Sequence, residues 1–424
     1  MFRKKSKYFY TIILLLVAFT SRAGFILLPM DESTQQNHLK AYGITFWCLE
    51  KQYKASWLLN YRGGSFLLPD SPEIRKECQI RGVSFEPLSD GEANSILEEI
   101  SSPSQNMETV ILEKAPKIAV YTPKGKQPWD DAVTLVLTYA EIPFTPIYDE
   151  EVLTDGLLLY DWLHLHHEDF TGQYGKFYGN YKNTPWYIEQ KRDAEALATK
   201  LGYAKVSEEK LAVAKKIRDF VIGGGFMFAM CSATDSFDIA LAAEGVDICE
   251  PMFDGDPSEG NYQSKIDYSQ SFAFKDYILE RSPNVYEFSN IDMTPKRMNI
   301  PMEKDYFTLM EFSAKWDPIP SMLCQNHTQL VKGFMGQTTA FERNVLKSSV
   351  LVMGECQLNG EARYIHGERG KGMFTFYGGH DPEDFRHQVG DPPTVLDLHP
   401  TSPGYRLILN NVLFPAARKK KQKT

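Results

Sequence analysis

One cysteine of this 424-residue chain stands where an enzyme would place a nucleophile. Cys231 follows the apolar run FMFAM (226–230), which predicts a buried strand, and precedes TDSFDIALAAEG (234–245), which predicts a helix. At such a turn the thiol is exposed at the carboxyl edge of a sheet, next to backbone N–H groups of Ser232 and Ala233 that can stabilise an oxyanion. The helix N-terminus also lowers a thiol pKa. The alternative is an inert thiol, because free cysteine is among the most buried residue types.

A histidine that could act as the base follows a second predicted strand. His380 lies in YGGHDPEDF (377–385), behind two glycines that permit a tight turn and the close approach of a ligand. If the two strand ends meet at one edge of a sheet, His380 reaches Cys231, and Glu383 or Asp381 orients the imidazole. The alternative is a surface loop with solvated carboxylates. We predict catalytic roles for Cys231, His380 and Glu383, and substrate contacts at Ser232 and Gly379.

A histidine-rich stretch, YDWLHLHHEDF (160–170), gives a third cluster. In a strand, His164 and His166 face the same side, and the residues after them fall at its carboxyl end. We predict substrate contacts for His166, His167, Glu168 and Asp169. The spacing does not match a zinc motif, and the six cysteines show no CxxC pair, so no metal or cofactor is predicted.

The elements that must position these residues alternate between strand and helix. This pattern predicts an α/β fold with two doubly wound units and parallel sheets, the second flavodoxin-like. The first unit spans 24–106 and ends in the linker SSPSQN (101–106). The second spans 107–417 and is interrupted by insertions at 171–200 and 252–345, and a basic tail follows at 418–424. The aromatic residues of the first insertion form its own core or, alternatively, stack on sugar rings.

The N-terminus predicts export. A basic start precedes an apolar run from Tyr8 to Phe19, and Ser21-Arg22-Ala23 is small at both key positions before a cut. We interpret residues 1–23 as a signal peptide cleaved before Gly24, which leaves no transmembrane anchor and places the protein in the periplasm or outside the cell. The chain carries 46 Lys and Arg against 55 Asp and Glu, a net charge of −9, which argues against nucleic acid as a partner.

Two segments resemble a known fold. GGGFMFAMCSATDS (223–236) and GERGKGMFTFYGGHDPEDF (367–385), with SPGYRLILNNVLFPA (402–416), are similar to the class I glutamine amidotransferase-like fold, in its trehalose-utilisation (ThuA-like) branch. The resemblance implies Cys231 as nucleophile, His380 as base and Glu383 as its orienter. The family's Gly-x-Cys-x-Gly is replaced here by Ala-Met-Cys-Ser-Ala, and its His-Pro-Glu carries an extra residue. Trehalose-utilisation-like proteins generally lack the cysteine.

A second resemblance concerns the first unit. LLPMDESTQQNHLKAYGITFW (27–47) and WLLNYRGGSFLLPD (57–70) look like a secreted bacterial family often labelled asparagine synthetase B. That activity needs a cysteine exposed as the first residue and a Ser-Gly-Gly-x-Asp-Ser pyrophosphate loop. The sequence has Phe2 and Gly24 at the two possible starts and lacks the loop, so the motifs do not support the label.

These observations lead to three functional expectations. The first is an exported amidotransferase-like hydrolase in which the Cys231 thiolate attacks an amide, an ester or a sugar-derived substrate and water resolves the intermediate. The second is a binding or envelope protein that keeps the fold without chemistry. The third is a metal-assisted carbohydrate enzyme that uses the cluster from His164 to Asp169. A small molecule, with carbohydrates as one class, is the expected partner.

Overall fold

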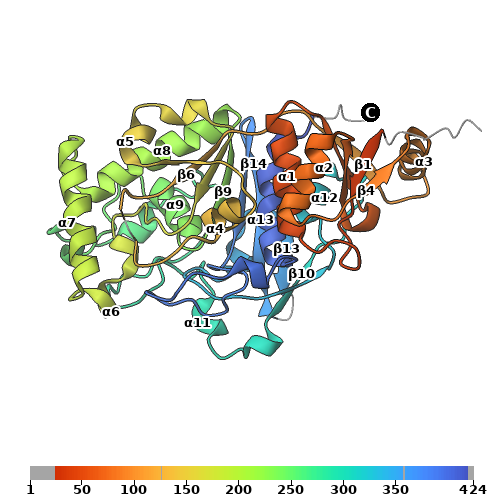
Figure 1. Cartoon of the computed structure of the whole chain (residues 1–424). Coiled ribbons are helices and arrows are strands. Elements are labelled where there is room, and N and C mark those ends of the chain that lie inside the picture. The colour runs from red at the N-terminus through yellow and green to blue at the C-terminus, as the bar shows by residue number, and fades with distance from the viewer. Residues whose placement is uncertain (1–23, 126, 357–358, 419–424) are drawn as a thin grey trace, which may run out of the picture.

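The computed structural model of the protein describes residues 24–125, 127–356 and 359–418 (Figure 1). Two sheets with their covering helices lie side by side. The predicted signal peptide, and the predicted basic tail beyond Arg418, lie outside the described residues. Within them, every helix is too short or too polar to cross a membrane.

The first sheet has five strands in the order β4-β1-β3-β2-β5. Their bounds are Phe25–Leu28 (β1), Ala55–Leu59 (β2), Ser65–Pro69 (β3), Glu86–Leu88 (β4) and Glu108–Leu112 (β5). The helices of this unit are His38–Glu50 (α1), Pro72–Arg81 (α2) and Asp90–Ser101 (α3).

All pairings in this first sheet are antiparallel, so the predicted parallel sheet is wrong for this unit. The reason lies in the turn between β2 and β3. Asn60 and Gly64 there take left-handed backbone angles, φ 61° and 86°, and close a short connection. Parallel neighbours need a crossover of about a dozen residues or more, so a turn this short makes a hairpin.

The first unit also extends beyond the expected linker. β5 lies after residue 106 and pairs with β2 along its length. Its last residue, Leu112, forms a bridge with Ala417 near the other end of the chain. One hydrophobic core contains residues of both units, for example Trp57 of β2 and Phe228 of the second sheet. The two units are therefore packed together through a common core.

The second sheet is mixed, which confirms the α/β fold class, and its antiparallel half departs from the parallel sheet that the sequence predicted. Its order is β11-β10-β13-β14-β15-β9-β8-β6-β7, with β12 paired to β14. The parallel strands are Ile118–Tyr121 (β6), Thr145–Ile147 (β7), Trp162–Leu165 (β8), Phe226–Met230 (β9) and Gly372–Tyr377 (β15). The antiparallel strands are Tyr306–Leu309 (β10), Leu330–Lys332 (β11), Phe341–Glu342 (β12), Leu351–Cys356 (β13) and Glu361–Arg369 (β14).

The helices of this unit cover both faces of the sheet or lie in the segments between its strands. They are Ala132–Tyr139 (α4), Asp149–Leu153 (α5), Tyr178–Tyr181 (α6), Pro185–Lys200 (α7), Val206–Gly223 (α8), Ala233–Ala242 (α9), Pro251–Asp254 (α10), Thr294–Arg297 (α11), Pro318–Cys324 (α12) and Pro403–Leu413 (α13).

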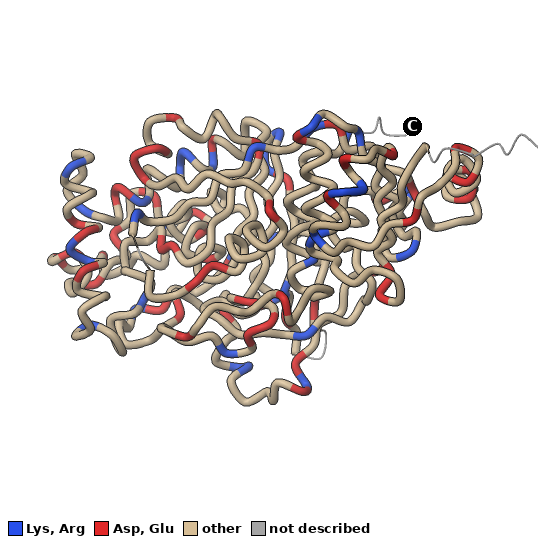
Figure 2. Tube along the Cα trace, viewed as in Figure 1, with Lys and Arg blue, Asp and Glu red and all other residues tan. Residues whose placement is uncertain are grey.

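Alternate residues of the central strand β9 enter different cores. Phe228 and Met230 join the core that α4 and α13 share with the first unit, whereas Met227 and Ala229 pack in the core of α8 and α9. This is the alternation that a strand buried on both faces requires. Helix α13 contacts α1, α4 and α12 and lies between the two units (Figure 1). Acidic and basic residues are interspersed over both units (Figure 2).

Candidate active site

The carboxyl ends of the parallel strands bring the predicted site residues to one edge of the second sheet. His166 and His167 follow β8, Cys231 follows β9, and His380 follows β15 after two glycines. The strands β8, β9 and β15 are neighbours in the order of the sheet. Ligands of open α/β sheets bind at this edge.

Cys231 has the strained backbone of a strand-to-helix elbow. Its φ is +52°, a left-handed value that is uncommon for a residue with a side chain. The residue is only 4% exposed, and burial raises the pKa of its thiol to about 12. In the part of the chain that the structure describes, its sulfur makes no hydrogen bond to His380. Ser232, predicted to bind substrate, is buried and its carbonyl accepts from the Ser236 N–H at 3.1 Å.

The carboxylates after His380 are engaged with other partners. Glu383, the predicted orienter of His380, pairs with Nδ1 of His399 at 3.1 Å. Asp381 accepts from the Tyr405 hydroxyl at 2.7 Å and from the Glu383 N–H at 2.8 Å. The Asp-Pro-Glu stretch folds back on itself and points these groups toward α13 and the following loop. The Cys–His–Glu arrangement predicted from the sequence is therefore not assembled among the described residues.

His380 lies within a cluster of histidines. Its ring centroid is 4.9 Å from that of His166, 4.7 Å from His167 and 4.3 Å from His387. The side chain is buried, and neither ring nitrogen has a hydrogen-bond partner among the described residues. Burial, together with the neighbouring imidazoles, holds the pKa of His380 well below its usual range. The ring is therefore neutral at physiological pH.

His164 and His166 face the same side of β8, as predicted, and both approach one carboxylate. Oδ2 of Asp131 lies 3.2 Å from Nε2 of His164 and 3.2 Å from Nδ1 of His166. The contact between His166 and Asp131 does not have the angles of a hydrogen bond. Both nitrogens of His166 therefore lack a hydrogen-bond partner among the described residues. The other carboxylate oxygen of Asp131 accepts from the N–H of Thr134 at 2.8 Å and caps α4.

The neighbouring aspartate fixes two further histidines. The carbonyl of Asp130 lies 2.7 Å from Nε2 of His167, which donates to it. The Asp130 carboxylate lies 2.9 Å from Nε2 of His387, and Asp384 lies 2.9 Å from Nδ1 of the same ring. The two carboxylates, with Asp130 the stronger influence, raise the pKa of His387 to about 9. His387 is therefore an imidazolium at neutral pH.

Glu168 and Asp169 have different roles in the structure. Burial raises the pKa of the Glu168 carboxyl to about 7, and the charge of Asp131 adds to this effect. Asp169 accepts from the N–H of Thr171 at 2.7 Å and from that of Gly175 at 3.0 Å. It thereby anchors the start of the first insertion.

A cavity of about 340 Å³ adjoins this cluster. Its lining combines three carboxylates, one imidazole, hydroxyl and amide groups, and apolar side chains: Thr122, Gln127, Trp129, Asp130, Asp131, Thr134, Leu135, Phe144, His167 and Glu168. The size and this mixture are typical of small-molecule sites.

The first insertion supports the wall of the cavity. Trp129 contacts the ring of His167 at 5.5 Å and stacks on Phe177 at 5.3 Å. The other aromatic residues of the insertion pack on one another, with Tyr174, Phe177 and Tyr187 at their centre. They form a core of their own, which was the first of the two interpretations of this segment.

Sequence reasoning did not identify Asp130, Asp131 and His387. The dipeptide Asp130-Asp131 follows β6 and precedes a helical segment, which is a usable signal because it lies at the same sheet edge. His387 gave no comparable signal, since its place beside His380 depends on the path of a long loop.

Three overlapping sets of side chains in this cluster have ligand atoms within 4.8 Å of one another, close enough to hold a metal ion. They are His166, His167 and His380; Asp130, His380 and His387; and Asp131, His164 and His166. The cluster therefore offers acid–base groups and metal-ligand groups next to one cavity.

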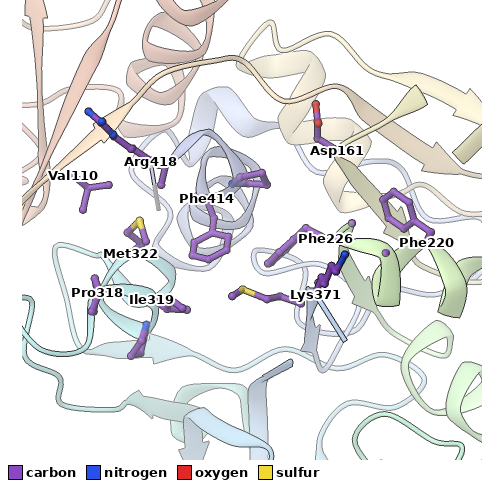
Figure 3. Close-up of a pocket in the computed structure, with 18 of the residues that line it drawn as sticks. Val110, Asp161, Phe220, Phe226, Pro318, Ile319, Met322, Lys371, Phe414 and Arg418 are labelled. Carbon is purple, nitrogen blue, oxygen red and sulfur yellow. The ribbon is translucent and has the colours of Figure 1, made fainter. Parts of the chain in front are cut away.

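A larger cavity of about 1080 Å³ lies at the opposite, amino edge of the sheet (Figure 3). Phe226 of β9, Phe414 and Met322 contribute apolar surface to it, and Lys371 lines its rim. Its lining contains no histidine or cysteine and none of the predicted site residues. The groups that could do chemistry thus gather at the carboxyl edge.

Comparisons with known proteins do not extend this description. No family model matches the chain, and no curated protein matches it. Among solved structures, cytoplasmic protein STM3548 from Salmonella typhimurium is 11% identical over 72% of this chain and 100% of its own, with a TM-score of 0.35. Cytoplasmic protein STM1381 from Salmonella typhimurium LT2 is 13% identical over 71% of this chain and 100% of its own, also at 0.35.

A third solved structure, the GH42 beta-galactosidase Gan42B, is 11% identical and covers 63% of this chain and 28% of its own, with a TM-score of 0.28. TM-scores this low carry no argument about fold family or activity. The resemblance to the trehalose-utilisation branch therefore stays a prediction.

Proposed function

We propose that this chain is an exported hydrolase for a small polar molecule, and that its reaction takes place in the cavity beside His167 and Glu168. The observation that carries the proposal is the convergence of Glu168, His167 and Asp131 on one cavity of ligand size. A carboxyl whose pKa is about 7 can take up and release a proton near neutral pH, which a general base requires.

The proposed reaction uses Glu168 as the base. Its carboxylate accepts a proton from a water molecule, the water oxygen bonds to the electrophilic carbon of the substrate, and the same proton passes to the leaving group as its bond breaks. The carboxylate is then regenerated. Asp131 contributes by raising the proton affinity of Glu168. Amides, esters and sugar-derived compounds are the substrate classes to which this chemistry applies.

The test is a panel of chromogenic esters, amides and glycosides assayed with the purified chain. We expect turnover of at least one class, and a Glu168→Gln variant that loses about 100-fold or more in kcat because the base is removed. Glu383→Gln is the matched control, since Glu383 pairs with His399. Equal rates for Glu168→Gln and the unmodified chain would contradict the role of Glu168. A chain that binds members of the panel and hydrolyses none would be a binding protein.

A second candidate function is the thiol-dependent hydrolase expected from the sequence. The left-handed backbone of Cys231 favours it, because nucleophiles at strand-to-helix elbows are held in such strained conformations. The pKa of about 12 opposes it, since the thiolate is then scarce at neutral pH. Loss of turnover in Cys231→Ser with full turnover in Glu168→Gln would establish this candidate in place of the first.

Export is the part of the proposal that rests on residues 1–23. The test is to express the full chain in a bacterium, separate the cell fractions and determine the first residue of the product. We expect a product that starts at Gly24 and is recovered outside the cytoplasm. A chain that keeps Met1 and stays in the cytoplasm would contradict export without affecting the proposed chemistry.

A further inference from the structure

We propose that His166, His167 and His380 bind one divalent transition-metal ion of the zinc class. This inference deepens the proposed function, because the ion would lie beside the cavity that contains Glu168. The three side chains come from the end of β8 and from the turn after β15, two strands that flank β9 in the sheet. Each offers a ring nitrogen, and these atoms lie within 4.8 Å of one another.

The strongest observation is the lack of partners for buried ring nitrogens. His166 is 1% exposed and His380 is 6% exposed, and in each ring both nitrogens lack a hydrogen bond among the described residues. An unsatisfied buried polar atom destabilises the folded state, so folded proteins pair nearly all of them. An ion bound by a nitrogen of each ring would satisfy one of the two buried nitrogens in His166 and in His380.

The second observation is the set of contacts behind the ligands. His167 donates from Nε2 to the carbonyl of Asp130, which leaves Nδ1 free for an ion. Nδ1 of His166 faces the Asp131 carboxylate at 3.2 Å, which leaves Nε2 free. Carboxylates and carbonyls in this position fix the orientation of a metal-bound imidazole and strengthen it as a ligand.

The same contacts count against the other two sets. His387 is held between Asp130 and Asp384 at 2.9 Å from each, which is the arrangement of an imidazolium in an ion pair. Asp131 already accepts a hydrogen bond from the Thr134 N–H and faces two histidines. Carboxylates that hold the far side of a metal-bound histidine are placed in this way. The set of three histidines is therefore the one in which every ring keeps a nitrogen that contacts no carboxylate or carbonyl.

Three imidazole ligands select the class of ion. Nitrogen ligands of intermediate softness suit zinc, copper, iron and nickel, whereas magnesium and calcium prefer oxygen. Three protein ligands leave a fourth position for water or substrate, which is the pattern of hydrolytic zinc sites. His167 is the member that lines the cavity, so this open position would be next to the substrate. A bound ion there would lower the pKa of a water molecule and assist the step assigned to Glu168.

The test measures zinc on the full chain after treatment with EDTA, addition of zinc sulfate and gel filtration. We expect about one equivalent of zinc per chain, and a loss of affinity of 100-fold or more in His167→Gln and His380→Gln because a ligand is removed. His399→Gln and Cys231→Ser serve as controls and should keep the zinc. Circular dichroism of each variant verifies its fold, and cobalt substituted for zinc should give the visible absorption bands of a tetrahedral nitrogen site.

The outcomes separate this inference from the proposed function. Absence of zinc from the folded chain, or its retention in both His167→Gln and His380→Gln, would overturn the metal site. Hydrolysis by an EDTA-treated chain that binds no zinc would overturn the site and leave the proposed function standing. Zinc bound at these residues in a chain that hydrolyses no substrate class would establish the site and contradict the hydrolase.

Discussion

His380 stacks on His387, with ring centroids 4.3 Å apart and planes inclined by 16°. The two rings differ in charge, because carboxylates on both sides keep His387 protonated and burial among imidazoles keeps His380 neutral. His380 also lies beside the two histidines that follow β8. His380, which the sequence predicted as the base for Cys231, thus belongs to a cluster of histidines and is not the partner of the thiol.

The reactivity of the cysteines follows from this arrangement. We expect iodoacetamide at pH 8 to modify Cys356, which is partly exposed, faster than Cys231, which is buried with a pKa of about 12. The thiolate is the reactive form, so a raised pKa and exclusion from solvent both slow the reaction. Peptide mass spectrometry over a time course measures both rates. Preferential labelling of Cys231 would show an activated thiol and contradict the account.

The turn before His380 should tolerate substitution poorly. Gly379 has φ +100°, and a Cβ added there would lie 2.5 Å from the ring of Phe334. We expect Gly379→Ala to lower the free energy of unfolding by more than about 1 kcal/mol, since both the backbone angle and the space oppose a side chain. Gly260→Ala is the matched control, because its added Cβ meets no atom within 4 Å. Urea titrations measure both, and equal stability of the two variants would argue against this turn geometry.

Stability should fall in acid because of two histidines at the junction of the units. His38 and His327 lie with ring centroids 4.7 Å apart, and burial lowers the pKa of His38 to about 2 and that of His327 to about 4. Their folded pKa values lie below the unfolded value of 6.5, so the unfolded chain binds more protons. The contribution of these two histidines to stability is then constant above pH 6.5 and declines as the pH falls from 6.5 toward 4.

The decline is about 1.4 kcal/mol per pH unit for each histidine that stays neutral in the folded chain. A His38→Phe variant keeps an aromatic ring at the contact and removes one of the two groups that bind a proton only when the chain unfolds. We expect its unfolding free energy, measured in urea at pH 7.5 and pH 5.0, to change less with pH than that of the unmodified chain. An identical pH dependence would exclude His38 as a source of the acid sensitivity.

Local pattern was enough to predict much of the second sheet. The placement of Cys231 after a buried strand and the common orientation of His164 and His166 both depend on strand periodicity. The first sheet was predicted with the wrong strand direction because alternation of strands and helices does not specify which strands pair. There, β1 pairs with β3 and β4, not with the next strand along the chain.

The site was harder to predict because its contacts join distant loops. Asp131 looks in the sequence like an ordinary helix cap, and only the neighbouring strand β8 shows that its second oxygen faces two histidines. Glu383 lies three residues from His380 and yet pairs with His399, since the intervening proline and aspartate turn the chain. Spacing along the sequence could not distinguish these outcomes.

The most direct test of the central claim compares kcat for Glu168→Gln and Cys231→Ser on one substrate identified by the panel. If the reaction belongs to the histidine and carboxylate centre, Glu168→Gln loses about 100-fold or more and Cys231→Ser stays within about threefold of the unmodified chain. The reverse order, with Cys231→Ser inactive and Glu168→Gln fully active, would contradict the account.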